Sequence, residues 1–162
     1  MTSLTTHTEF DGFLSGLRQA SVVALDTEST GLDVQSGRDY LMGMSLAYRG
    51  PDGQVYSEYF PFRHEADNLD RGLADRLLSA LSGIRVVFHN RKFDLHSLNT
   101  LASVVHPMDG WDTLLICHMI NENQPYEKSL DACAKRYIKK GKTQKDEVHA
   151  LSLIHISEPT RR

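Results

Sequence analysis

The chain has 162 residues, of which 40% are hydrophobic and 24% are charged, which is typical of one globular domain and excludes disordered or fibrous proteins. Its 18 basic and 21 acidic residues give a formal net charge of −3, which excludes binding to nucleic acid through overall positive charge but allows a local basic surface. No stretch approaches the roughly 18 consecutive apolar residues that span a membrane, and the N-terminus lacks the pattern of a signal peptide.

Hydrophobic spacing predicts one helix and three strands in the first part of the chain. Apolar residues recur at helical spacing over Phe10–Leu17, and Thr8 precedes them as a candidate N-cap. A β-prone run over 21–25 predicts a strand that is buried on both faces. Two further runs, over 40–48 and 55–60, are separated by a Pro-Asp-Gly turn and predict a hairpin.

Helices dominate the rest of the chain. We expect a strand over 85–88, a short strand before residue 113, and helices over 69–81, 90–101, 113–120 and 127–139. Candidate N-caps are Asp67 or Asn68 for the first of these helices, Asn90 for the second and Asp112 for the third. A hairpin followed by alternating strands and helices predicts an α/β fold, with a mixed sheet of antiparallel hairpin and parallel strands flanked by helices on both faces.

The most informative motif is Asp26-Thr27-Glu28, at the end of the first buried strand. Extended backbone places alternate residues on one face, so the two carboxylates are expected to lie side by side. Two acids at a sheet edge repel each other unless a cation lies between them, and a divalent metal that prefers oxygen ligands would satisfy both. The alternative is structural, with one acid serving as a turn or cap residue and the other solvated.

A further acid comes after the strand over 85–88, because Asp94 lies in the first turn of the next predicted helix. In an open α/β sheet, ligands gather at the carboxyl ends of the strands, so we expect Asp94 to approach Asp26 and Glu28. Asp94 alone would be explained as a charge favoured by the helix dipole. Three carboxylates at one sheet edge instead predict a metal site.

Two segments resemble the first two motifs of the DEDD superfamily of 3′–5′ exonucleases. Val-Ala-Leu-Asp26-Thr-Glu28-Ser-Thr-Gly-Leu resembles the first motif, and Phe88-His-Asn-Arg-Lys-Phe-Asp94 resembles the second. The segments 111–115 and 129–137 resemble the region after these motifs in the proofreading domain of family A (polymerase I-type) DNA polymerases and in phage stand-alone versions. The resemblance implies an RNase H-like fold and the release of nucleoside monophosphates from 3′ ends.

The resemblance also implies cofactors, site residues and partners. Two Mg²⁺ or Mn²⁺ ions would be held by Asp26, Glu28 and Asp94, and would activate a water and stabilise the leaving 3′ oxygen. Expected substrate contacts come from Thr27, Leu32, Asn90 and Phe93. The alternatives for the last three are a loop hydrophobe, a helix cap and a core residue. Expected partners are single-stranded DNA or frayed 3′ ends, and a DNA polymerase in cis or in trans.

Basic residues cluster at the end of the last predicted helix. The run begins at Lys135 and Arg136 and continues through Lys139, Lys140, Lys142 and Lys145. Contact with the phosphate backbone would reconcile an acidic protein with a nucleic-acid substrate. The structural alternative is a solvated helix face. For Asp112 the choice is similar, between an N-cap and a role behind the metal ligands.

The fourth acid of the superfamily is missing. Its pattern is Tyr-x-x-x-Asp or His-x-x-x-x-Asp, but no Asp stands four residues after Tyr137, and Asp146 has no Tyr or His at the required spacing before it. Residues 151–161 resemble a translated sequencing adapter. We therefore expect an exonuclease domain over 1–150 that is incomplete at its C-terminus, a non-native tail over 151–162, and an inactive fragment.

Two other functions compete with the exonuclease hypothesis. The Asp26 motif superficially resembles the nucleophile loop of haloacid dehalogenase-type phosphatases, in which Asp26 would be a covalent nucleophile. A non-catalytic nucleic-acid-binding domain is the third possibility. Cys117 and Cys133 have neither CxxC nor zinc-site spacing, so we expect reduced thiols in the cytoplasm of a bacterial or phage-infected cell.

Overall fold

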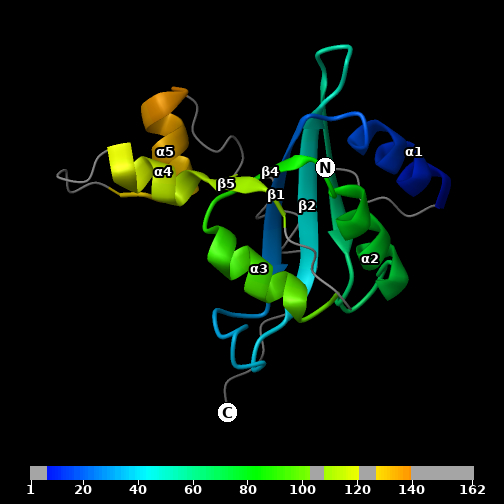
Figure 1. Cartoon of the computed structure of the whole chain (residues 1–162). Coiled ribbons are helices and arrows are strands. Elements are labelled where there is room, and N and C mark those ends of the chain that lie inside the picture. Colours follow the sequence, from blue (N-terminus) through cyan, green and yellow to red (C-terminus); the bar gives the residue numbers. More distant parts are fainter. Residues whose placement is uncertain (1–6, 103–107, 121–126, 140–162) are drawn as a thin grey trace. The chain divides into compact units, whose positions relative to one another are not determined.

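The computed structural model describes residues 7–102, 108–120 and 127–139, and these fall into two units, Met1–Ile116 and Cys117–Arg162, which are described separately. The elements are α1 (His7–Leu17), β1 (Val22–Ser29), β2 (Leu41–Arg49), β3 (Val55–Pro61), α2 (Arg71–Ala80), β4 (Arg85–Phe88), α3 (Arg91–Asn99), β5 (Gly110–Asp112), α4 (Thr113–Ile120) and α5 (Leu130–Tyr137) (Figure 1). Among the described helices, none has the length and apolar character needed to cross a membrane.

Five strands form one mixed sheet in the order β3-β2-β1-β4-β5, with β1 at its centre (Figure 1). β1 pairs antiparallel with β2, which pairs antiparallel with β3. On its other edge β1 pairs parallel with β4, and β4 pairs parallel with β5. The mixed sheet with its antiparallel hairpin and parallel strands confirms the predicted fold class.

The two faces of β1 differ in burial, and this difference positions the acidic motif. Val23, Leu25 and Thr27 are buried, whereas the alternate residues from Val22 to Glu28 are exposed. Helix α1 packs on the buried face, where the rings of Phe10 and Phe60 meet edge to face with 6.0 Å between their centroids. The exposed face therefore carries Asp26 and Glu28.

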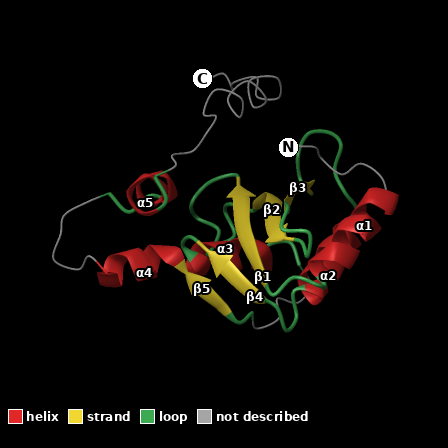
Figure 2. Cartoon of the chain, turned by 90° about the horizontal axis from the view of Figure 1, so that it is seen from above, coloured by secondary structure: helices red, strands yellow, loops and turns green. Residues whose placement is uncertain are grey.

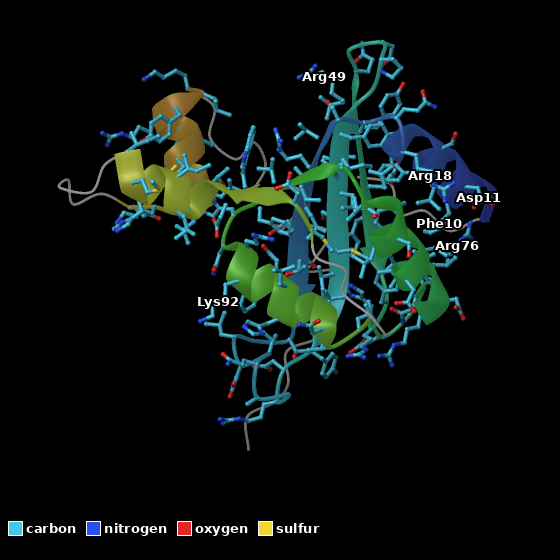
Figure 3. All side chains as sticks on the ribbon, in the orientation of Figure 1. Phe10, Asp11, Arg18, Arg49, Arg76 and Lys92 are labelled. Carbon is cyan, nitrogen blue, oxygen red and sulfur yellow. The ribbon has the colours of Figure 1, made fainter. Side chains whose placement is uncertain are left out.

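The helices of the first unit share the buried face. α2 lies beside α1 (Figure 2), and the guanidinium of Arg76 lies over the Phe10 ring and pairs with Asp11 at 2.7 Å (Figure 3). α3 joins the same face through a hydrogen bond to Thr27. Flanking helices are thus confirmed, and α1, α2 and α3 contribute to one hydrophobic core on the buried face.

Two of the predicted helix caps are wrong. α1 begins at His7, so Thr8 lies inside the helix. The N-cap of α2 is Asp70, whose carboxylate accepts the backbone N–H of Gly72 at 2.7 Å. Asp67 and Asn68 lie before this position, because α2 begins at Arg71, and the Asn68 side chain binds the backbone of His64 instead.

The second unit contains the end of α4, and α5. Ser129 caps α5 by accepting the backbone N–H of Ala132, so this helix starts later than predicted. Cys117 and Cys133 are both buried, and neither forms a disulfide. Burial, followed by the neighbouring Cys133, raises the pKa of the Cys117 thiol to about 11.

Candidate active site

Asp26 and Glu28 lie at the carboxyl end of β1, on its exposed face, as the spacing predicted. They stand opposite Ser45 and Gly43 of β2 in the antiparallel register. Their carboxylates are therefore accessible to solvent and to a large ligand. The buried residue between them, Thr27, points to the other face of the sheet.

Asp94 reaches the sheet from α3, where it lies in the first turn of the helix and is only 2% exposed. Its Oδ1 accepts a hydrogen bond from Thr27 Oγ1 at 2.7 Å, whereas its Oδ2 is buried without a partner. Burial raises the pKa of Asp94 to about 6; the Thr27 hydrogen bond lowers it, and the charge of Asp26 raises it further. Thr27, expected to touch substrate, thus has Asp94 as its partner.

Asp26 is near enough to Asp94 for its charge to raise the pKa of that carboxyl, but Asp26, Glu28 and Asp94 do not form a closed ligand set. In the ranges that the structure describes, no three His, Cys, Asp or Glu side chains gather closely enough to hold one ion. Asp94 instead binds Thr27, whose side chain alternates with those of Asp26 and Glu28 along β1. The donor chemistry nevertheless fits Mg²⁺ or Mn²⁺, since carboxylate oxygens are their usual ligands and Asp94 Oδ2 is a buried acceptor without a donor.

Tyr59 and His64 were not anticipated from the sequence. The Tyr59 hydroxyl, from β3, lies 3.1 Å from Glu28 Oε2 and 2.6 Å from His64 Nε2. Burial raises the pKa of Tyr59 above its usual range, and the charge and hydrogen bond of Glu28 act in the same direction, so the phenol keeps its proton. The sequence signal that could have revealed this arrangement is Gly43, because a glycine inside a strand often marks a close approach.

Asp112 caps two helices, and this changes the interpretation of Asn90. The Asp112 carboxylate accepts the backbone N–H groups of Asn90 at 3.1 Å, Arg91 at 2.9 Å and Leu114 at 3.0 Å. It therefore caps α4, as predicted, and also holds the start of α3. Asn90 stands at the N-cap position of α3, as predicted, with a φ of 85°, but its side chain makes no capping hydrogen bond, and the Asp112 carboxylate caps this helix instead.

The remaining candidate residues are distributed around these groups. Leu32 is 88% exposed in the loop after β1, and Phe93 is half-buried on α3. Lys135 pairs with Asp131 of the same helix at 2.6 Å, as expected for a solvated helix face, and Arg136 is exposed beside it. The rest of the basic run, from Lys140 onward, and the predicted tail lie outside the described residues.

Sequence comparison connects the chain to one enzyme family. A family model described as 3′–5′ exonuclease matches residues 1–157. The DNA polymerase DpoZ of Salmonella phage PMBT28 is 36% identical over 124 residues, which cover 76% of this chain and 18% of that protein. DNA polymerase I of Borreliella burgdorferi is 26% identical over 140 residues, which cover 84% and 14%. The chain thus spans less than a quarter of the length of these polymerases.

Solved structures share the fold. RNase D of Trypanosoma brucei matches with a TM-score of 0.70 at 16% identity, over 94% of this chain and 52% of that one. NrnC of Brucella melitensis, solved with bound Mg²⁺, matches with a TM-score of 0.59 at 21% identity, over 80% and 59%. The architecture is that of RNase H-like exonucleases, as the two sequence motifs implied.

Proposed function

Because the chain belongs to the 3′–5′ exonuclease family, we propose that its site binds the 3′ end of single-stranded or frayed DNA and hydrolyses the terminal phosphodiester bond. The observation that carries this proposal is the pair of exposed carboxylates on β1, beside a buried Asp94 that has one unsatisfied oxygen. The relatives named as DNA polymerases favour DNA over RNA, and a polymerase in cis or in trans as partner, in the cytoplasm of a bacterial or phage-infected cell.

Each described residue of the site has a proposed role in metal binding, positioning or substrate contact. Asp26, Glu28 and Asp94 would hold Mg²⁺ or Mn²⁺, which when bound supplies an activated water and charge stabilisation for the leaving 3′ oxygen. Asp26 and Glu28 lie where a polymer can reach them, and Thr27 fixes the orientation of Asp94. The exposed Leu32 is available to contact the terminal base, with Asn90 and Phe93 at the start of α3 near the strand.

A second proposal concerns the 162-residue chain itself, which we expect to bind nucleic acid but to digest it slowly or not at all. The supporting observation is in the sequence, where no Asp stands four residues after Tyr137 and Asp146 has no Tyr or His at the required spacing before it. Without a fourth carboxylate, a bound ion would lack a ligand. The same chain would then behave as a non-catalytic nucleic-acid-binding domain.

Digestion of a DNA oligonucleotide tests the function. We expect any digestion of 3′-labelled single-stranded DNA to require Mg²⁺ or Mn²⁺, to start at the 3′ end, and to be lost in Asp26→Asn. Asp11→Asn is the matched control, because it removes an exposed carboxylate on α1. An RNA oligonucleotide of the same sequence, assayed in parallel, decides between DNA and RNA.

Three results would overturn the exonuclease proposal. They are digestion that persists in EDTA or in Asp26→Asn, hydrolysis of a simple phosphomonoester in place of DNA, and a chain that neither digests DNA nor binds Mn²⁺ through these carboxylates. Binding of DNA in EDTA, without turnover when Mg²⁺ or Mn²⁺ is added, would favour the second proposal. Rapid digestion by the 162-residue chain would contradict it.

A further inference from the structure

We infer that Tyr59 and His64 are positioning residues that orient the Glu28 carboxylate for a divalent cation. This inference rests on the proposed function, because it assigns Glu28 to that site. The Tyr59 hydroxyl lies 3.1 Å from Glu28 Oε2 and 2.6 Å from His64 Nε2, so the three side chains form one hydrogen-bonded chain. Neither Tyr59 nor His64 belongs to the motifs that carry the family resemblance.

The contact between Tyr59 and Glu28 crosses the sheet. Tyr59 is paired with Ser45, and Glu28 with Gly43, so the tyrosine reaches from β3 over β2 to β1. Gly43 makes this reach possible, because a Cβ at that position would collide with the phenolic oxygen of Tyr59. The glycine therefore leaves open the path along which the hydroxyl approaches the carboxylate.

The number of available hydrogens determines which group donates in each hydrogen bond between His64, Tyr59 and Glu28. The Tyr59 hydroxyl has one hydrogen, and an ionised Glu28 can only accept. The arrangement that satisfies all three groups has His64 Nε2–H donating to the Tyr59 oxygen while the Tyr59 O–H donates to Glu28 Oε2. Glu28 Oε1 then accepts no hydrogen bond from the described residues and is left for a cation.

The side chain of Asn68 holds the backbone of His64 in place. Its N–H donates to Asn68 Oδ1 at 2.6 Å, and Asn68 Nδ2 donates to the His64 carbonyl at 2.7 Å. The rings of Tyr59 and His64 meet edge to face, with 5.7 Å between their centroids. Tyr59 and His64 are thus held by contacts that do not involve Glu28. They can therefore fix the direction of the Glu28 carboxylate, which is otherwise exposed.

Another tyrosine on β3 provides a matched comparison. The hydroxyl of Tyr56 also donates to a carboxylate, Asp52 Oδ2 at 2.8 Å, but this pair lies in the turn of the hairpin. Substituting Phe at either position removes the same atom from the same strand. Only the change at Tyr59 is expected to alter the site, because groups that orient a ligating carboxylate typically contribute 10–100-fold to metal affinity.

Titration of the protein with Mn²⁺, followed by the electron paramagnetic resonance signal of the free ion, tests the inference. We expect Tyr59→Phe and His64→Leu to weaken Mn²⁺ binding about tenfold. His64→Gln is expected to restore most of it, because its amide N–H can replace Nε2–H. Tyr56→Phe is expected to bind as the wild type does. Thermal unfolding of each variant shows whether it is folded.

A double-mutant cycle separates positioning from general loss of structure. In a Glu28→Gln background, Tyr59→Phe should produce no further loss of Mn²⁺ affinity. The inference is overturned if folded Tyr59→Phe binds Mn²⁺ like the wild type, or if His64→Gln is as weak as His64→Leu. In both cases the loss of binding in Asp26→Asn would leave the proposed function standing. A wild type that binds no Mn²⁺ would overturn both proposals.

Discussion

Thr27 Oγ1 donates a hydrogen bond of 2.7 Å to the buried carboxylate of Asp94, and this bond joins β1 to α3 across 67 residues of sequence. It is a contact between the middle of one motif and the end of the other. Its position on the buried face explains why Asp94 is almost inaccessible while Asp26 and Glu28 are exposed. The buried carboxylate should give the protein a characteristic dependence on pH.

Asp94→Asn is predicted to remove a pH-dependent part of the stability. The pKa of Asp94 is about 6 in the folded protein, above its ordinary value of 3.8, so the folded state binds the proton more tightly. The resulting stability is present below about pH 4 and is lost as the pH rises through about 6. Urea unfolding in EDTA should show the wild type losing on the order of 2–3 kcal/mol relative to Asp94→Asn across this range. A constant difference would contradict the prediction.

Asp112→Ala is predicted to weaken two helices at once. Its carboxylate accepts backbone N–H groups at the start of α3 and of α4. A lost N-cap costs about 0.5–2 kcal/mol, so we expect the free energy of unfolding to fall by about 1–3 kcal/mol. Asp109→Ala is the control, because its exposed pair with Arg85 contributes at most about 1 kcal/mol. Equal effects of the two changes, measured by urea unfolding, would exclude the double cap.

Gly43→Ala is predicted to destabilise the sheet and to displace Tyr59 from Glu28. The added methyl group would collide with the Tyr59 hydroxyl, and such overpacking costs about 1–3 kcal/mol. Gly12→Ala should have the opposite sign, because Gly12 lies in α1 with nothing near its added Cβ, and alanine favours a helix by about 0.5–1 kcal/mol. Thermal unfolding of both variants checks the signs, and Mn²⁺ titration should show weaker binding only for Gly43→Ala.

Cys117 is predicted to resist alkylation in the folded protein. The thiolate is the reactive form, and burial raises the pKa of this thiol to about 11, well above neutral pH. Treatment with iodoacetamide at pH 7.5, followed by mass spectrometry, should label Cys117 much more slowly in the native protein than in urea. Rapid labelling under native conditions would mean that the thiol is accessible and ionised.

The elements were largely predictable because they depend on local spacing. β4 over 85–88 and α4 over 113–120 have the predicted bounds, and the first strand ends with its two acids on one face. The caps of the first two helices, expected at Thr8 and at Asp67 or Asn68, were not predictable. A short polar side chain can hydrogen-bond to several nearby backbone groups, and only the folded structure decides which. The Asn68 side chain binds the backbone of His64.

The sequence by itself determined the family motifs, the mixed α/β architecture and the common face of Asp26 and Glu28, because strand periodicity of two residues is a local property. Only the tertiary structure decided which face of β1 receives Asp94, that Asp112 holds α3, and that Tyr59 reaches Glu28 over Gly43. These contacts join residues that are 67, 21 and 31 positions apart. They arise from strand pairing and helix docking, which no local pattern of residues specifies.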